Sequence, residues 1–174
     1  VKYMWSMFAH TSFNQPIGSW NVSNVDDMEG MFWNAALFNQ DISSWDVSKV
    51  VNMRGMFLLA SSFNQSLNQW DVSTVENMSG MFEGAATFNG AMDTWDLSNV
   101  SDMYGMFLGA SSFNQPIGNW DVSKVTDMSG LFALAGVFNQ AIGGWDVSNV
   151  VSMRNMFQQA NAFNSSIGLW DVSR

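Results

Sequence analysis

Tryptophan recurs every 25 residues along the chain, and this spacing constrains the fold more than any other feature of the sequence. Its positions follow one another without insertion: Trp20, Trp45, Trp70, Trp95, Trp120, Trp145 and Trp170. Other positions recur in step and give the unit W-[DN]-[VL]-S-x-V-x-x-M-x-x-[ML]-F-x-x-A-x-x-F-N-x-x-[ILM]-x-x. Self-similarity at such a period is the signature of a tandem-repeat solenoid. Because one unit cannot bury its apolar face alone, neighbouring units must share a core.

We therefore expect a single tandem-repeat domain over residues 1–174, a length sufficient to bury a substantial core. A partial first copy occupies residues 1–19, complete units start at residues 20, 45, 70, 95, 120 and 145, and a truncated last unit occupies residues 170–174. Since Val1 is not an initiator methionine and both terminal copies are incomplete, we expect the sequence to be an excerpt of a longer protein.

The apolar spacing within the unit predicts secondary structure. Apolar side chains fall at i, i+3, i+6, i+7 and i+10, at Val50, Met53, Met56, Phe57 and Ala60. This spacing predicts a helix over residues 50–60, with Ser48 as its N-cap. The alternation over residues 45–47 predicts a short strand that pairs with its equivalents in neighbouring units. The expected fold class is an α/β repeat solenoid, leucine-rich-repeat-like, with about seven 25-residue units and a parallel sheet on one face.

Composition excludes several functional classes. The net charge of -9 and the pI near 4.1 argue against nucleic acid or an anionic membrane as a partner. The absence of cysteine excludes disulfides and thiolate metal sites, and no apolar run approaches the ~20 residues of a membrane span. The single histidine, His10, has no recurrent acidic or serine partner, and no catalytic or phosphate-binding motif is present. We expect no enzymatic activity and no cofactor.

An asparagine follows the second phenylalanine of every unit without exception. The column comprises Asn14, Asn39, Asn64, Asn89, Asn114, Asn139 and Asn164. We interpret it as a structural ladder of buried amides that satisfies backbone groups in a turn, because an orphan buried group costs about 1 to 3 kcal/mol.

An aspartate follows the tryptophan in six units, with Asn21 at this position in the first. Two interpretations compete: each carboxylate accepts the backbone N–H two residues on, or the column binds calcium. The calcium ligands would be Asp46, Asp71, Asp96, Asp121 and Asp146, with Asp171 at the end of the column. Asn21 favours the first interpretation, since asparagine keeps the hydrogen bond but not the charge. The tryptophans themselves fit a core better than an exposed platform for sugars.

The string W-D-V-S-N-V, found at residues 145–150, and the string F-N-Q at residues 63–65 resemble the repeat of the BspA-like leucine-rich-repeat surface proteins. That repeat also occurs in mycoplasma and Listeria-type surface lipoproteins and in some algae. The resemblance spans essentially the whole chain. It implies a secreted or cell-surface protein with a role in adhesion, a curved leucine-rich-repeat-like solenoid, and no catalytic residues.

The leading functional hypothesis is a non-enzymatic surface or extracellular module that binds a protein or carbohydrate partner. The predicted ligand face consists of variable residues before each tryptophan: Ser43, Ser44, Asn68, Gln69, Asp93, Thr94, Asn119 and Leu169. The alternative is a structural building block that self-associates end to end, because neither end carries a polar cap. Mineral binding through the aspartate column is a third, weaker hypothesis.

Overall fold

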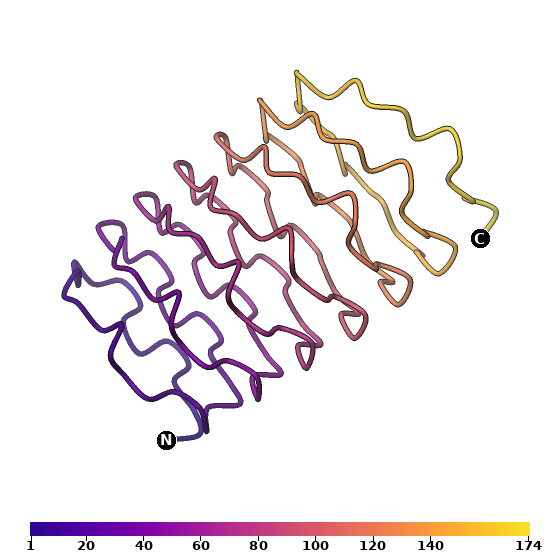
Figure 1. The fold of residues 1–174 in the computed structure, drawn as a ribbon. Helices are drawn as coiled ribbons and strands as arrows, with labels where there is room; N and C mark the ends of the chain where they lie inside the picture. The colour runs from indigo at the N-terminus through magenta and orange to yellow at the C-terminus, as the bar shows by residue number, and fades with distance from the viewer.

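The chain winds through successive coils that stack from the N-terminus to the C-terminus (Figure 1). The computed structural model describes residues 1–174, and each complete unit forms one coil. It contains no helix and no strand. Extended pairing is limited to isolated parallel bridges that link equivalent residues of adjacent coils: Tyr3, Asp27, Asn52, Asn77, Asp102, Asp127 and Ser152. No segment forms a helix of the length and hydropathy needed to cross a membrane.

The helix predicted over residues 50–60 is wrong. Gly55 and Leu59 have φ angles of 57° and 58°, which a right-handed helix does not admit. Alternate N–H groups, from Met56 to Ala60, donate to the carbonyl three residues earlier. The segment is therefore a run of β-turns. The turns direct the same apolar side chains inward that a helix would have placed on one face, which is why the spacing misled.

The strand predicted over residues 45–47 and the parallel sheet are also wrong. Val47 begins a turn, since its carbonyl accepts the N–H of Val50 at 2.8 Å. The bridges between coils lie elsewhere, at Asn52 and its equivalents, and each involves a single residue. The α/β repeat solenoid and its leucine-rich-repeat-like character are thus replaced by a stack of coils made of turns.

One side of every coil is joined to the next coil by its backbone. The N–H of Met28 donates to the Asn52 carbonyl at 3.0 Å, and the N–H of Gly30 donates to the Arg54 carbonyl at 2.8 Å. The next N–H along the chain, that of Met31, closes a turn within its own coil on the Met28 carbonyl, and the N–H of Phe32 again donates to the neighbouring coil, at the Met56 carbonyl. Alternate amides thus serve the neighbouring coil and the local turn, which satisfies the backbone without a regular sheet.

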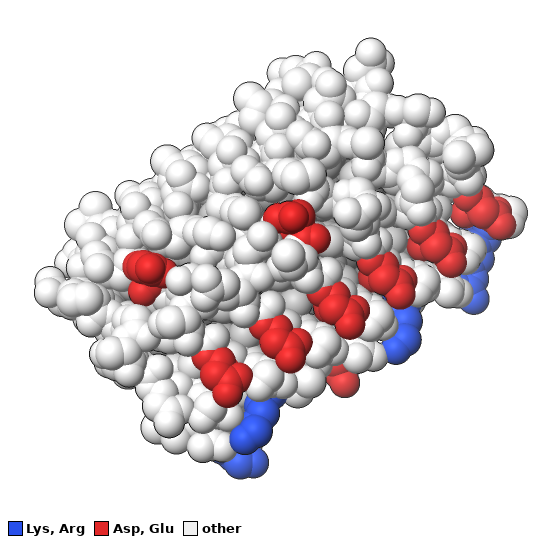
Figure 2. All heavy atoms as spheres, in the orientation of Figure 1, with Lys and Arg blue, Asp and Glu red and all other residues white.

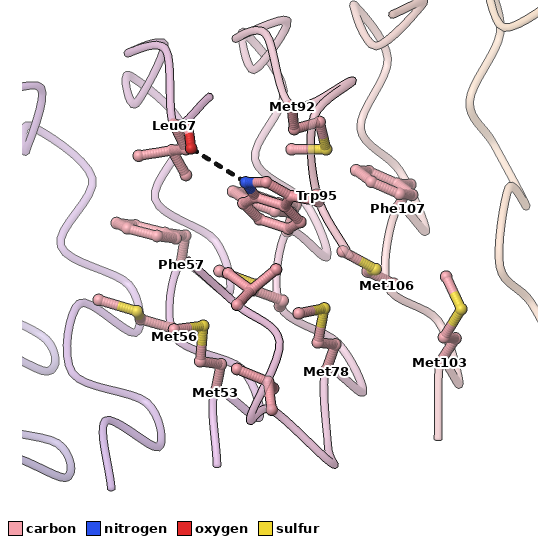
Figure 3. Close-up of a cluster of buried hydrophobic side chains, with 14 of the residues drawn as sticks. Met53, Met56, Phe57, Leu67, Met78, Met92, Trp95, Met103, Met106 and Phe107 are labelled. Carbon is pink, nitrogen blue, oxygen red and sulfur yellow. Dashed lines mark hydrogen bonds between the residues drawn. The ribbon is translucent and has the colours of Figure 1, made fainter. Parts of the chain in front are cut away.

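On the opposite side, side chains replace most of the backbone bonds. The indole Nε1–H of Trp95 donates to the Leu67 carbonyl of the preceding coil at 2.9 Å (Figure 3). Equivalent bonds of 3.0 to 3.2 Å join the other tryptophans, from Trp45 to Trp170, to the carbonyl 28 residues earlier. The repeated tryptophan is therefore both a core residue and a hydrogen-bonding tie between coils.

The interior is one continuous core of 50 buried apolar residues. Phe57 stacks on Phe82 of the next coil with ring centroids 5.5 Å apart and an interplanar angle of 7°. Within a coil, Phe57 also stacks on Phe63 at 4.0 Å. Methionines such as Met53 and Met78 fill the space beside these columns with no exposed surface (Figure 3). Because every coil adds the same side chains, the core extends without a boundary between units.

Candidate functional site

The structure places the asparagine column in the turn that follows the second phenylalanine. The Oδ1 of Asn114 accepts the backbone N–H of Asn139 at 2.9 Å, and the same bond recurs from Asn14 to Asn164. In most coils a glutamine adds a second tie: the Nε2 of Gln140 donates to both the Oδ1 and the carbonyl of Asn114. The side chains are exposed or half-exposed rather than buried. They join coils at the surface.

Gly90 occupies the glutamine position in one coil and shows why that position is constrained. A Cβ atom on Gly90 would overlap the backbone carbonyl of Gln65. Here the coils approach closely enough for a direct backbone bond, from the N–H of Leu67 to the Ala91 carbonyl at 3.0 Å. Backbone contact thus substitutes for the missing side-chain tie.

The aspartate column is exposed, and Figure 2 shows acidic side chains in a row along one face of the stack. The Oδ1 of Asp46 accepts the hydroxyl of Ser48 at 2.6 Å and its backbone N–H at 3.2 Å. These bonds lower the pKa of Asp46, and serine two residues on lowers the pKa of Asp121, Asp146 and Asp171 in the same way. The column therefore closes turns. The structure contains no cluster of three or more acidic, histidine or cysteine side chains able to hold a metal ion.

The residues predicted as a ligand face lie in the turn before each tryptophan, where they are exposed or half-buried. Several bond to the neighbouring coil: the Ser44 hydroxyl donates to the Gly18 carbonyl at 3.0 Å, and the Asn68 amide donates to Asp93 at 2.9 Å. None of the eight predicted residues lines the hollows described below: Ser43, Ser44, Asn68, Gln69, Asp93, Thr94, Asn119 and Leu169.

Four hollows lie on the backbone-bonded side, along a column of buried glycines, whereas the largest hollow, of about 460 Å³, lies among apolar side chains at the C-terminal end of the stack. Gly30, Gly55, Gly80, Gly105 and Gly130 have φ angles from 57° to 65°. Glycine adopts this left-handed conformation without strain. Because these residues lack side chains, they leave a trough across the coils. We call this trough the glycine groove.

The glycine groove consists of hollows that follow one another along the stack. The two largest measure about 440 and 370 Å³ and share Tyr104 and Asp127 as lining residues. The first of them shares Arg54 with a hollow of about 190 Å³ toward the N-terminus. That hollow in turn shares Glu29 with the next, of about 310 Å³. The shared residues make the groove continuous across the coils.

Two rows of side chains form the walls of the groove, and both vary from coil to coil. The residues just before the glycine column are Glu29, Arg54, Ser79, Tyr104, Ser129 and Arg154. The residues three positions after it are Trp33, Leu58, Glu83, Leu108, Ala133 and Gln158. Neither row belongs to the strictly repeated positions that form the core. The glycine groove therefore presents different chemistry at each coil.

Electrostatics differ along the groove. Near its N-terminal end, Arg54 lies 3.4 Å from the carboxylate of Glu29, which also accepts the side-chain amide of Asn52 at 3.0 Å. In the middle, the carboxylate of Glu83 has neither a hydrogen bond nor an ion pair, and burial raises the pKa of this carboxyl. Tyr104 stands beside it with half of its surface exposed. The middle of the groove thus offers unpaired polar groups and an accessible ring.

The sequence contained a signal for this site that the helix interpretation obscured. Glycine recurs at the same position of five consecutive units, inside the segment predicted to be helical. Glycine costs about 1 kcal/mol in a helix interior, so its repetition there indicates a required backbone conformation. The variable positions on either side of that column are the groove walls.

The model of a family described as "Mycoplasma protein of unknown function, DUF285" matches residues 1–95 and again residues 85–174, so the two matches together span the chain. No curated protein and no solved structure matches it. The match agrees with the mycoplasma part of the resemblance noted above, and it carries no statement about leucine-rich repeats, secretion or adhesion.

Proposed function

The chain belongs to the DUF285 family of Mycoplasma proteins of unknown function, and from this premise we propose that it is a non-enzymatic interaction module that binds an extended partner in the glycine groove. The partner is a protein or a glycan. The cell-surface or extracellular placement implied by the resemblance to BspA-like proteins is part of this proposal.

The observation that carries the proposal is the contrast between a strictly repeated unit and variable groove walls. Tryptophan, the second phenylalanine and asparagine recur without exception because they pack or tie the coils. The residue before each groove glycine changes from Arg54 to Ser79 to Tyr104 in three successive coils. Stacked repeats form extended binding surfaces in this way, with a constant framework and one variable row per coil.

The chemistry of the groove favours binding over catalysis. Asp102 and Asp127 each use one carboxylate oxygen to accept the N–H two residues on, at 2.9 and 2.7 Å, so they close turns. The only histidine, His10, contacts Asn34 at 3.1 Å in the first coil. Nucleophilic catalysis uses a nucleophile held within hydrogen-bond reach of a base, and these residues form no such pair.

The test is a binding screen against immobilised extracellular proteins and glycans, made with two matched variants. Gly80→Asn places a side chain in the glycine groove. Gly109→Asn adds the same side chain at a second left-handed position, φ 70°, where a new Cβ meets only ordinary contacts at 3.7 Å. Asparagine tolerates this backbone, and Asn155 adopts φ 55° in the groove column itself.

We expect Gly80→Asn to lower the affinity for the partner about tenfold or more, because it occupies the space of the ligand, and Gly109→Asn to leave the affinity unchanged. Equal affinities for the two variants would refute the groove as the binding site. Light scattering over a concentration series tests the alternative on the same samples. If the mass of the particles grows with protein concentration, if Gly80→Asn does not alter this growth, and if the screen finds no partner, end-to-end self-association is favoured.

A further inference from the structure

This inference about the ligand rests on the proposed function. If the glycine groove is the binding site, the chemistry of its walls and floor also constrains the ligand. The backbone beneath the groove is already paired. The N–H of Gly80 donates to the Tyr104 carbonyl at 2.7 Å, and the N–H of Gly105 donates to the Ser129 carbonyl at 2.9 Å. A peptide that adds a strand to a sheet relies on free main-chain groups at an edge. The groove floor provides no such edge.

The walls do not fit the other common modes of peptide recognition either. Of the ten residues around the hollow of about 440 Å³ in the middle of the groove, two are hydrophobic. An amphipathic helix needs a hydrophobic groove, and a proline-rich segment needs one lined by aromatic side chains. The two middle hollows of the groove instead have mainly polar linings with a single aromatic ring, Tyr104.

The free polar groups of the middle coils include both hydrogen-bond donors and hydrogen-bond acceptors. Asn77 uses its Oδ1 to accept the N–H of Ser79 at 2.9 Å, which leaves its amide Nδ2 free to donate. Asp102 and Asp127 each use Oδ1 to close a turn, and each leaves Oδ2 free to accept. These residues occupy successive rungs of the bridge column, about 4.8 Å apart. The groove therefore presents one donor followed by two acceptors.

A hydroxyl group both donates and accepts hydrogen bonds, so a ligand rich in hydroxyls matches every one of these groups. A peptide N–H can only donate, and a peptide carbonyl can only accept. The ring of Tyr104, half of whose surface is exposed, adds an apolar surface with a polar tip. A sugar ring has the complementary form, with apolar C–H faces and hydroxyls around its edge.

We propose that the glycine groove binds a neutral oligosaccharide, with one sugar ring on Tyr104 and its hydroxyls bonded to Asn77, Asp102 and Asp127. An anionic glycan is disfavoured, because these two carboxylates and Glu83 would repel it. A basic peptide is the competing ligand, since carboxylates and a tyrosine ring also attract cations.

The test is an NMR titration of the full chain, with the groove glycine amides as reporters. The probes are linear hexasaccharides of glucose, N-acetylglucosamine and mannose, a sulfated hexasaccharide, and an Arg-Ser hexapeptide. We expect at least one neutral hexasaccharide to shift the amides of Gly80 and Gly105, and the sulfated sugar to shift neither. Tyr104→Ala should lower the affinity about tenfold, and Tyr104→Phe should retain most of it.

Asp102→Asn separates recognition from folding. Asn77 closes the same turn in the preceding coil, so the substitution keeps the turn while replacing a carboxylate acceptor with an amide. We expect about a tenfold loss of sugar affinity, because a hydrogen bond to a charged acceptor is lost. Asp71→Asn, at the exposed aspartate column, is the control and should leave the affinity unchanged.

Three outcomes would overturn the sugar proposal. The first is no shift of the groove amides at about 10 mM of any neutral hexasaccharide, a concentration that detects very weak binding. The second is sugar binding that Tyr104→Ala does not weaken. The third is binding of the peptide in the groove without any sugar, which would refute the ligand class but retain the groove as a binding site. Failure of the groove as a binding site is a separate result: in the binding screen, Gly80→Asn and Gly109→Asn would then have equal affinities for the partner.

Discussion

Replacing Asn114 with alanine removes one rung of the asparagine ladder, and its effect can be worked from the structure. The Oδ1 of Asn114 accepts the N–H of Asn139 and the Nε2 of Gln140, both at 2.9 Å. Each bond contributes about 0.5 to 1.5 kcal/mol, and water competes at this half-buried site. We expect the free energy of unfolding to fall by about 1 to 2 kcal/mol and Tm to fall by about 3 to 6 °C.

The assay is urea and thermal unfolding followed by tryptophan fluorescence, with two controls. Ser44→Ala removes one exposed bond, to the Gly18 carbonyl, and should change the stability by less than about 0.5 kcal/mol. Asn114→Asp retains the Oδ1 acceptor, and the Nδ2 that it removes bonds to no other group, so it should lose much less stability than the alanine variant. Similar Tm values for Asn114→Ala and Ser44→Ala would refute the ladder.

Three further predictions concern the backbone, the aspartate column and the core. Gly105→Ala should cost about 1 to 2 kcal/mol because φ is 58° there, while Gly105→Asn should cost less; equal losses in urea unfolding would contradict this. The Ser148 hydroxyl and N–H lower the pKa of Asp146 in the folded chain. The contribution of Asp146 to the free energy of unfolding is therefore fully present above its ordinary pKa of 3.8, and it is lost as the pH falls through the lower pKa of the folded state. Tm measured from pH 7 to pH 2 should therefore drop below about pH 4, and less so in Asp146→Asn. Trp95→Phe should cost about 2 kcal/mol or more, through the lost bond to Leu67 and a cavity, and an unchanged urea midpoint would refute the tie.

The repeat, the apolar core positions and the hydrogen bond within the aspartate column could be predicted from the sequence, because each reflects a local requirement; the asparagine column, predicted to be buried, is exposed or half-exposed and joins different coils. Tryptophan, methionine and phenylalanine recur where they pack, and the tryptophans of the inner coils, from Trp45 to Trp145, are almost completely buried. The hydrogen bond of Asp46 to the residue two positions on follows from the Asp-x-Ser spacing, and Asn21 at the same position accepts from Ser23 at 3.1 Å. Such relations depend on neighbours within one coil.

Secondary structure could not be read correctly, because one apolar pattern fits two backbones. Val50, Met53, Phe57 and Ala60 face the core either along one side of a helix or from successive turns around a coil. The left-handed residues decide between these backbones. Gly55 was the visible sign, whereas nothing about a leucine indicates positive φ, and the stacking of coils must stabilise it in Leu59.

The candidate site was missed for the same reason. The predicted ligand face rests only on the variability of the residues before each tryptophan, such as Ser44 and Thr94. The glycine groove exists because the coil requires left-handed residues, a consequence of the turns that the helix prediction removed. Variability on either side of that column, at Tyr104 and Glu83, gained meaning once the trough was known.

The position of a bound ligand tests the central claim most directly. Crystals of the chain would be soaked with the molecule that binds most tightly in the screen, and the electron density would be inspected along both faces of the stack. The glycine groove predicts density over Gly80, between Arg54 and Tyr104. Density against the turn that holds Ser44 and Gln69, with nothing over Gly80, would contradict the account.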